Sequence, residues 1–347
     1  MSLTYIGTSF DINEPYGPGE HAIIESVKTQ IEQTFPNDQC LLINLTWFGP
    51  QFSESNSKWD DVMEAGEFDR VFLLATVDPP MIGDYEISEI RRVTNAIHVY
   101  LLGNFDSPHA FNFFAPVVAD RFVKYNDDDL RLENIEKIFV SYNRKPKVHR
   151  VEFVQRLRDT KLDQYGTITL GIDETNIQNA GVAHDYISIG EQQEDYVSLG
   201  NHPAHWGFGI PLDNFSLHRM DIWKKTFLYV VGATEFQPHD NLFCQQDTFK
   251  AILGERPYII NGVQRTYRWL RYHGFRTFNH YWSHIDVENG PVHEGLVEVI
   301  RFLSKKSESE LKEMYIDMLP NLTYNRQRFY EFAEEQRNRI ANIFREP

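Results

Sequence analysis

The residues best suited to bind a charged ligand lie in one segment, IFVSYNRKPKVHRVEFVQRLR, which runs from Ile138 to Arg158. It has six Lys or Arg side chains and a single acid, Glu152, in a chain whose formal net charge is -16. Its basic residues are Arg144, Lys145, Lys147, Arg150, Arg156 and Arg158. Because the planar fork of an Arg side chain matches phosphate oxygens, the segment predicts a phosphate site. The alternative is a solvated basic loop whose arginines pair with surface acids.

The local pattern places this basic loop between a strand and a helix. The apolar run Ile138–Tyr142 predicts a strand, Asn143–Lys147 a loop and Val148–Asp159 a helix. The predicted helix has one apolar face, formed by Val148, Val151, Val154 and Leu157. Ligands of open α/β sheets bind at the carboxyl ends of strands, and a helix amino end carries partial positive charge. The loop therefore lies where a phosphate is expected.

The same alternation of strands and helices is predicted along most of the chain, which indicates an α/β fold with parallel sheets. Further strands are predicted at Leu41–Leu45, Val71–Thr76, His98–Leu102, Phe227–Gly232 and Pro257–Ile260, and Thr4–Gly7 is a short apolar run followed by a loop. Helices are predicted from about Glu20, over Asp247–Leu253, and over residues 308–319 and 325–345. The stretch 172–225 is rich in Gly, His, Asn and aromatic residues and predicts loops and short elements.

Length and composition favour a packed protein of two domains. A chain of 347 residues with 41% hydrophobic residues suits two cores, and the acidic stretch 125–136 indicates the boundary. Two cysteines without CxxC spacing fit a reducing cytosol, so we expect a cytoplasmic protein. No secretory signal is evident, and no apolar run reaches the ~20 residues of a membrane span. A pI near 5.3 disfavours non-specific duplex binding by the whole surface.

Two more segments carry candidate ligand-binding side chains. Glu235 follows a predicted strand, where a carboxylate can accept hydrogen bonds from two ribose or sugar hydroxyls; the alternative is a helix cap. Gln246, Asp247 and Lys250 lie on the first turns of a predicted helix, and Lys250 can meet a phosphate as a point charge. The alternative there is an ordinary surface helix.

We expect no metal site, because no HxH or HExxH spacing occurs and no carboxylate or cysteine accompanies His202 and His205 at helical spacing.

Three stretches together resemble the fucosyltransferase-like glycosyltransferases, a group with many viral, phage and bacterial members. SYNRKPKVHRVEFVQRL resembles the segment that opens the donor domain of that family. HVYLLGNFDSPHAFNFF and FCQQDTFKAILGERPYIINGVQRTYRWLRYHGFRTF resemble stretches before and after it. Asp286 and Asn325 fall where related sequences carry an Asp and an Asn, so the likeness covers roughly 98–325.

The resemblance implies the GT-B fold, in which two Rossmann-like domains face a cleft and a C-terminal helix packs back on the first domain. It implies an acceptor-side domain at 1–135, a nucleotide-sugar domain at 136–324 and a C-terminal helix at 325–347. The donor would be a UDP- or GDP-sugar, with no covalently bound cofactor and usually no metal. The resemblance assigns phosphate contacts to Arg144, His149 or Arg150, and Lys250, and a ribose or sugar contact to Glu235.

The chain departs from the family pattern at two places. The Glu-Lys pair that holds ribose and phosphate in the family falls on Gln246 and Asp247, and a family Arg falls on His293. An acid in the place of a phosphate-binding Lys repels a diphosphate at close range. Lys250 and the Asn143–Arg150 loop would then have to replace it, unless the donor differs or the site is impaired.

The implied function is transfer of a sugar to a hydroxyl, either on a hydroxymethylated base of viral or phage-type DNA or on a glycan. A host cytoplasm is implied if the protein is viral. An inverting reaction needs a base in the first domain, and Asp78 is favoured because it follows the predicted strand Val71–Thr76. The other acids at comparable places are Asp11, Glu14, Glu20 and Asp106. The alternative function, motivated by Gln246 and Asp247, is a non-catalytic nucleotide- or glycan-binding protein that retains the fold.

Overall fold

The structure, a computed structural model, describes most of the chain. The described residues are 2–7, 17–45, 67–76, 87–88, 90–91, 94–105, 107–143, 147–170, 215–217, 220–233, 236, 244 and 246–345. They belong to two compact units, each with its own parallel sheet. The first comprises Met1–Asp120, His239–Cys244 and Glu331–Pro347, and the second comprises Arg121–Pro238 and Gln245–Tyr330. The domain limits expected after residues 135 and 324 stay predictions.

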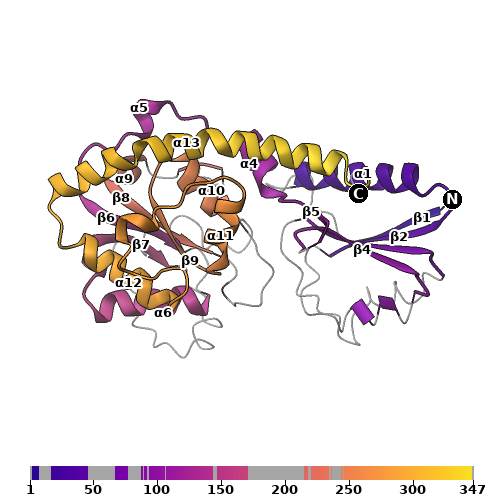
Figure 1. The fold of residues 1–347 in the computed structure, drawn as a ribbon, viewed down its shortest axis with the longest axis horizontal. Coiled ribbons are helices and arrows are strands. Elements are labelled where there is room, and N and C mark those ends of the chain that lie inside the picture. The colour runs from indigo at the N-terminus through magenta and orange to yellow at the C-terminus, as the bar shows by residue number, and fades with distance from the viewer. Residues whose placement is uncertain are drawn as a thin grey trace. The chain divides into compact units, whose positions relative to one another are not determined.

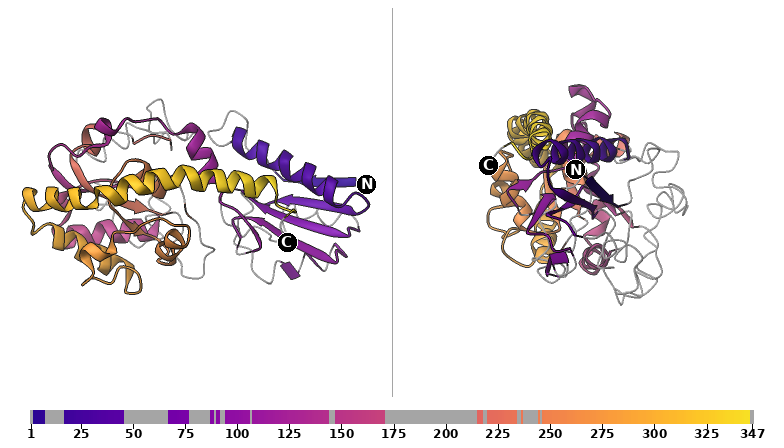
Figure 2. Two further views of the ribbon diagram at one scale, coloured as in Figure 1. Left: turned by 45° about the horizontal axis from the view of Figure 1, so that its top comes forward. Right: turned by 90° about the vertical axis from the view of Figure 1, so that its right-hand side faces the viewer.

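The first sheet has its described strands in sequence order, β1-β2-β3-β4-β5, and every neighbouring pair is parallel. The strands are β1 (Ser2–Ile6), β2 (Gln39–Asn44), β3 (Arg70–Ala75), β4 (His98–Gly103) and β5 (His109–Ala110). Helix α1 (Gly17–Thr34) covers one face of this sheet (Figures 1 and 2). It packs through Ile24, Val27 and Ile31, which recur at helical spacing along the helix predicted from about Glu20 and are at most 2% exposed.

The C-terminal helix α13 (Glu308–Ala341) ends in the first unit, as predicted. In that unit Gln336 Oε1 accepts a hydrogen bond from the backbone N–H of Asn112 at 2.8 Å, and Arg337 pairs with Asp120. Just beyond the helix, the Phe344 ring packs edge-on against Phe72 with centroids 5.5 Å apart. These contacts hold the end of α13 on the first unit.

The expectation of two separate helices at 308–319 and 325–345 is wrong, because α13 continues through Pro320. A proline inside a helix removes one backbone hydrogen bond. Met318 and Leu322 remain buried on either side of it. Asn325 exchanges hydrogen bonds with the backbone of Arg276, whose N–H donates to Oδ1 at 2.7 Å and whose carbonyl accepts from Nδ2 at 2.8 Å. Burial and this amide pair hold the helix together where the sequence pattern indicated a break.

The second sheet has the order β7-β6-β8-β9 and is also parallel. Its strands are β6 (Lys137–Asn143), β7 (Gly166–Leu170), β8 (Thr226–Gly232) and β9 (Tyr258–Asn261). The chain passes from β6 to β7 on one side and later places β8 on the other side of β6. The topological switch point therefore lies between β6 and β8, where ligands of doubly wound sheets bind.

Helices cover both faces of the second sheet (Figure 1). Helices α6 (Val148–Asp159) and α12 (Val292–Leu303) lie together on one face, and α10 (Gln246–Leu253) packs against β8 on the other. The shorter elements are α4 (Phe114–Arg121), α5 (Asp127–Leu130), α9 (Met220–Trp223), α11 (Arg265–Tyr272) and the 3-10 helices Asp163–Tyr165 and Asn279–Trp282. The α/β class, the two parallel Rossmann-like sheets and the C-terminal helix that ends in the first unit are confirmed, and two such units are consistent with the GT-B type.

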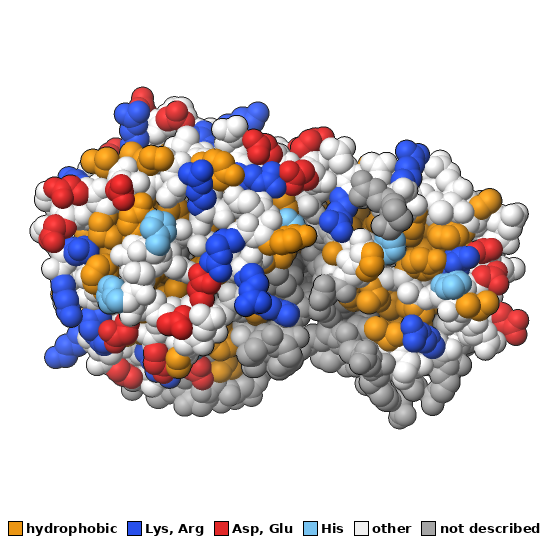
Figure 3. Space-filling model, viewed as in Figure 1, with side chains coloured by type: hydrophobic (Ala, Val, Ile, Leu, Met, Phe, Trp, Pro, Cys, Tyr) orange, Lys and Arg blue, Asp and Glu red, His pale blue; other side chains and the backbone are white. Residues whose placement is uncertain are grey.

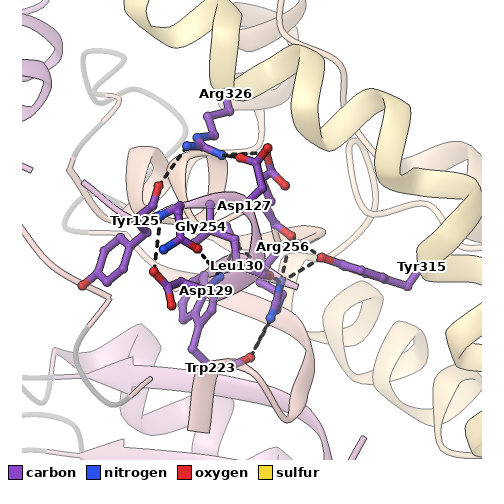
Figure 4. Close-up of polar contacts among 11 residues, drawn as sticks. Tyr125, Asp127, Asp129, Leu130, Trp223, Gly254, Arg256, Tyr315 and Arg326 are labelled. Carbon is purple, nitrogen blue, oxygen red and sulfur yellow. Dashed lines mark hydrogen bonds and ion pairs between the residues drawn. The ribbon is translucent and has the colours of Figure 1, made fainter. Parts of the chain in front are cut away.

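A buried arginine fixes the amino edge of the second sheet (Figure 4). Arg256, just before β9, is 1% exposed. Its guanidinium donates to the carbonyl of Trp223 at 2.9 Å, of Thr226 at 3.0 Å and of Leu130 at 2.7 Å, and to the Tyr315 hydroxyl at 3.0 Å. Burial lowers the pKa of this guanidinium. The side chain joins the segments that enter β6, β8 and β9.

On the face drawn in Figure 3, acidic and basic side chains of the second unit are interspersed, with apolar side chains between them. Of the helices that the structure describes, none has both the length and the apolar character needed to cross a membrane.

Candidate functional site

Buried polar side chains gather at the carboxyl edge of the second sheet, at its switch point. Asn143 at the end of β6 and Asn261 at the end of β9 are fully buried. His149 and Arg150 in the first turn of α6 are each 6% exposed. Burial of polar groups costs free energy unless they are hydrogen-bonded, so such a group of residues needs a structural or functional reason. We take this edge as the candidate site.

Arg150 links α6 to the end of β8 across the switch point. Its Nη2 donates to the carbonyl of Gly232 at 2.6 Å and to that of Ala233 at 3.0 Å. A Cβ atom on Gly232 would lie 2.7 Å from Asn143 Oδ1 and 3.5 Å from Arg150 Nε. The β8 backbone thus approaches these two side chains directly, and a larger residue than glycine at position 232 would displace them. Arg150 places a permanent positive charge inside this edge.

His149 is held as a neutral imidazole. Its Nε2 lies 2.9 Å from the carbonyl of Ala233, which can only accept, so Nε2 carries the hydrogen. Burial, and then the charge of Arg150, lower the pKa of His149 to about 3. At neutral pH its Nδ1 therefore has no hydrogen to donate. The phosphate contact expected of His149 or Arg150 stays a prediction, and Arg150 is the member of the pair that carries charge.

An aromatic stack joins the site to α12. The Phe236 ring stacks on His149 with centroids 4.8 Å apart and on His293 with centroids 5.0 Å apart. His293 is 5% exposed, and its Nδ1 lies 3.7 Å from a carboxylate oxygen of Glu152. Burial lowers the pKa of His293 as well. Within the described part of the chain, His293 Nε2 has no hydrogen-bond partner.

The two α10 residues predicted to contact the donor lie at different depths. Gln246 begins the helix and is half-buried, whereas Lys250 is 2% exposed. Lys250 Nζ lies 3.6 Å from Asp247 Oδ1. The acid that departs from the family pattern is therefore the partner of a buried cation. The phosphate role of Lys250 stays a prediction, as does the role of Gln246.

Several predicted residues lie outside the part of the chain that the structure describes. They are Asp78, Arg144 and Glu235, together with Asp11, Glu14 and Asp106. Asn261 and Phe236 were not predicted as members of this site, and His293 was noted only as the position of a family Arg. Asn261 directly follows the predicted strand Pro257–Ile260, and that position was the signal that could have identified it. Phe236 and His293 lie far apart in the sequence, and no local pattern joins them.

The first unit has its own buried polar group, around Glu20. This residue is fully buried in the first turn of α1, and its Oε1 accepts from Asn44 Nδ2 at 3.0 Å and from Thr76 Oγ1 at 2.8 Å. Asn44 ends β2 and Thr76 follows β3. The carboxylate thus joins α1 to two strand ends, which is a structural role. The sheet of the first unit has no reversal of strand order among its described strands. Because ligands of open α/β sheets bind where the strand order reverses, we assign the candidate ligand site to the second unit.

One cavity, of about 380 Å³, lies away from the switch point. Its lining residues are Phe122, Val123, Lys124, Tyr125, Leu253, Arg326 and Tyr330. Arg326 is already engaged there, with Asp127 at 2.7 Å and Glu255 at 3.3 Å (Figure 4 shows it above the Arg256 contacts). Leu253 and Tyr125 precede the starts of β9 and β6, so the cavity belongs to the amino edge of the sheet.

Among the described residues, no group of three His, Cys, Asp or Glu side chains is placed to hold a metal ion.

Comparisons with known proteins bear on the fold alone. The sequence matches no protein-family model and no curated protein. A solved structure of a protein from Listeria monocytogenes, described as a UDP-N-acetylglucosamine 2-epimerase, aligns with 98% of this chain and 83% of its own chain. The sequence identity is 9% and the TM-score is 0.36. At that level the likeness says nothing of what this chain binds or catalyses.

Proposed function

We propose that this protein is a glycosyltransferase that takes its sugar from a nucleotide-diphosphate donor. The observation that carries the proposal is the convergence of Asn143, Arg150 and Asn261 at the switch point of the second sheet, beside the amino end of α6. In a doubly wound sheet this is the place for a nucleotide. The resemblance of the segment 138–158 to the donor domain of fucosyltransferase-like enzymes supports the same ligand.

The amino end of α6 suits a diphosphate. Among the described residues no side chain caps this helix, whose N-cap is Lys147. Amides at an uncapped helix amino end, reinforced by the helix dipole, bind anions. The loop residues Arg144 and Lys145 lead directly into it along the chain. Since Lys250 is paired with Asp247, the segment from Arg144 to Arg150 supplies the charge that holds the diphosphate.

The reaction would join the acceptor oxygen to the anomeric carbon of the sugar while the bond from that carbon to the diphosphate breaks. The acceptor proton passes to a carboxylate of the first unit, for which we propose Asp78. The diphosphate leaves with additional negative charge, which the cations of the 144–150 segment stabilise. The acceptor would be a hydroxyl of a modified DNA base or of a glycan, and Glu235 would bind the donor ribose or sugar.

Titration calorimetry with a panel of UDP- and GDP-sugars tests the donor site. Wild type is expected to bind at least one donor at millimolar concentration or below, and Arg144→Ala to weaken that binding about tenfold, equivalent to about 1.4 kcal/mol. The matched control is Arg131→Ala, because the Arg131 side chain is 71% exposed and lies on a different element. Absence of binding at millimolar donor, or an Arg144→Ala isotherm equal to that of wild type, would overturn the proposal.

Turnover separates a transferase from the alternative, a non-catalytic protein that binds a nucleotide or glycan. The Asp247–Lys250 pair favours this alternative, because it removes one cation from the donor. Release of nucleoside diphosphate from the bound donor, lost in Asp78→Asn and in Glu235→Ala, would support the enzyme. Tight donor binding with no release under any acceptor would leave only the binding function.

A further inference from the structure

Helix α13 exposes an apolar stripe in the part that belongs to the second unit. The stripe is formed by Ile316, Pro320 and Tyr324, which follow each other at intervals of four residues and so lie on one face of the helix. All three are exposed, Ile316 at 64% and Tyr324 at 37%. Figure 3 shows apolar side chains at the surface along the course that α13 takes in Figure 1.

The opposite face of α13 is the one that packs on the core of the second unit. Leu311, Met318, Leu322 and Phe329 lie on that face and are at most 3% exposed. The stripe is therefore turned away from the core of its own unit. A solvated helix face normally carries polar side chains, and an apolar face with a polar rim is typical of a surface that binds another molecule.

Charges of opposite sign lie at the two ends of the stripe. Toward its amino end, Glu313 and Asp317 are exposed on the same face of the helix, and neither forms an ion pair with a described residue. Toward its carboxyl end, the Arg276 guanidinium lies 3.9 Å from the centroid of the Tyr324 ring and donates to the side chain of Asn321. Both of these partners of Arg276 are neutral, so its charge is not compensated by an acid within the described part of the chain.

We propose that this face of α13 binds the same face of a second copy of the chain, with the two helices antiparallel about a twofold axis at Pro320. Ile316 and Tyr324 are each four residues from Pro320, so an antiparallel pair brings Ile316 of one copy opposite Tyr324 of the partner subunit. The same operation brings Asp317 opposite the cation that lies over that ring, Arg276 of the partner subunit. An isologous interface must be self-complementary, and this face meets that requirement in its apolar contacts and in its charges.

The face is short, which limits the strength of the dimer. Residues 313–327 of α13 rise about 21 Å. Stable interfaces bury about 800 Å² on each partner, which is more than one helix face of this length offers. We therefore expect a dissociation constant in the micromolar range or above, and weaker association at high salt because the charges at the two ends are exposed. The face contains no residue of the candidate site, so this proposal does not depend on the transfer reaction.

Sedimentation velocity over a series of protein concentrations at low salt tests the proposal. Wild type is expected to shift from monomer to dimer as its concentration rises. Ile316→Lys is expected to weaken this association at least tenfold, because it places a charge within the apolar contact. The matched control is Ile97→Lys, since Ile97 is 77% exposed and lies in the first unit. This control is expected to dimerise as wild type does.

Charge reversal tests the register of the two helices. Arg276→Glu and Asp317→Arg are each expected to dimerise at least tenfold more weakly than wild type, because each variant places like charges opposite each other. An equimolar mixture of the two variants is expected to form a heterodimer about as strong as the wild-type dimer. In that heterodimer both contacts across the axis again join opposite charges, which a change confined to one copy could not restore.

Three outcomes would overturn the proposal. They are a wild type that stays monomeric up to about 1 mM, equal association of wild type and Ile316→Lys, and a mixture of the two charge variants that associates no better than either variant alone. Arg276→Gln and Asp317→Asn, each expected to weaken the dimer several-fold, replace the reversals if those fail to fold, as judged by circular dichroism. Donor titration on the same samples keeps the two proposals apart, because loss of the dimer with donor binding intact concerns this face alone.

Discussion

Asp247 and Lys250 form an ion pair one turn apart on α10, with 3.6 Å between the Asp247 carboxylate and the Lys250 ammonium group. The Lys250 side chain is 3% exposed and that of Asp247 is 22% exposed. A buried ammonium group without a nearby anion is costly. Asp247, which departs from the family pattern at a place where a lysine is expected, therefore has a structural reason to be an acid.

Removing the acid alone is expected to destabilise the protein. Asp247→Asn removes the carboxylate that lies 3.6 Å from the buried Lys250 ammonium group, and we expect a loss of about 1–3 kcal/mol in the free energy of unfolding, which is below the value for a fully buried pair because Asp247 is partly solvated. The double variant Asp247→Asn/Lys250→Met is expected to recover part of this loss. Urea denaturation of the wild type, of Asp247→Asn, of Lys250→Met and of the double variant gives the coupling energy.

The exposed pair Glu308–Lys312 provides the control for this cycle. Its side chains are 51% and 42% exposed, and Glu308→Gln is expected to change the free energy of unfolding by less than about 0.5 kcal/mol. Strict additivity of the two α10 substitutions would contradict the pairing, because independent groups have no coupling energy.

Arg256 is expected to be among the most sensitive positions of the second unit. Arg256→Met leaves the buried carbonyls of Leu130, Trp223 and Thr226 without this donor, and we expect a loss of about 3–5 kcal/mol. Arg256→Lys is expected to restore only part of it, because an ammonium group cannot reproduce the planar fork. Chemical denaturation checks both, and Arg131→Met should stay within about 0.5 kcal/mol of wild type.

The sequence predicts β2, β3, β4, β6, β8 and β9 because these strands are mostly continuous apolar runs, whereas β5 and β7 were not predicted. The strand segments Val71–Thr76 and Phe227–Gly232 are buried on both faces of their sheets. A strand covered on both faces needs an almost continuous run of apolar residues, and such runs are what predicted these strands. Helices were harder to place. In α11 the exposed arginines outnumber the few apolar residues, so the sequence showed no clear apolar face. At Pro320 helix α13 continues because tertiary contacts outweigh the local effect of a proline.

The candidate site was predictable only where its parts are adjacent in the sequence. The strand, loop and helix around Arg150 are contiguous, so charge and periodicity indicated them together. The stack of His149, Phe236 and His293 joins three distant segments, and only the fold brings them into contact. The role of Asp247 depends on the burial of Lys250, which the helical pattern of α10 does not reveal.

Glu20 is expected to stabilise the first unit through its two hydrogen-bond donors. Glu20→Ala leaves the buried groups Asn44 Nδ2 and Thr76 Oγ1 without this acceptor, and we expect a loss of about 2–4 kcal/mol in the free energy of unfolding. Glu20→Gln keeps one acceptor oxygen and should cost less. Glu25 on the same helix is the control, since it is 52% exposed and Glu25→Ala should change stability by at most about 0.5 kcal/mol. Equal effects of the two alanine substitutions would contradict the role of Glu20.

His149 is expected to make the stability of the second unit depend on pH. Its pKa is about 3 in the folded protein and 6.5 in an ordinary environment, because burial and the charge of Arg150 oppose protonation. Between these values the unfolded chain binds a proton that the folded chain does not. Stability therefore falls as pH decreases through this range, by up to about 1.4 kcal/mol per pH unit, and the contribution is constant above 6.5.

The variant His149→Gln isolates this effect, because glutamine does not titrate and can still donate to the carbonyl of Ala233. We expect the variant to be less stable than wild type at pH 7, because glutamine has no ring to stack on Phe236. We also expect its free energy of unfolding to fall less steeply than that of wild type between pH 6.5 and 5. Most carboxylates stay ionised in that window, so the difference in slope reports the imidazole. Parallel stability curves for wild type and His149→Gln would show that His149 titrates normally in the fold.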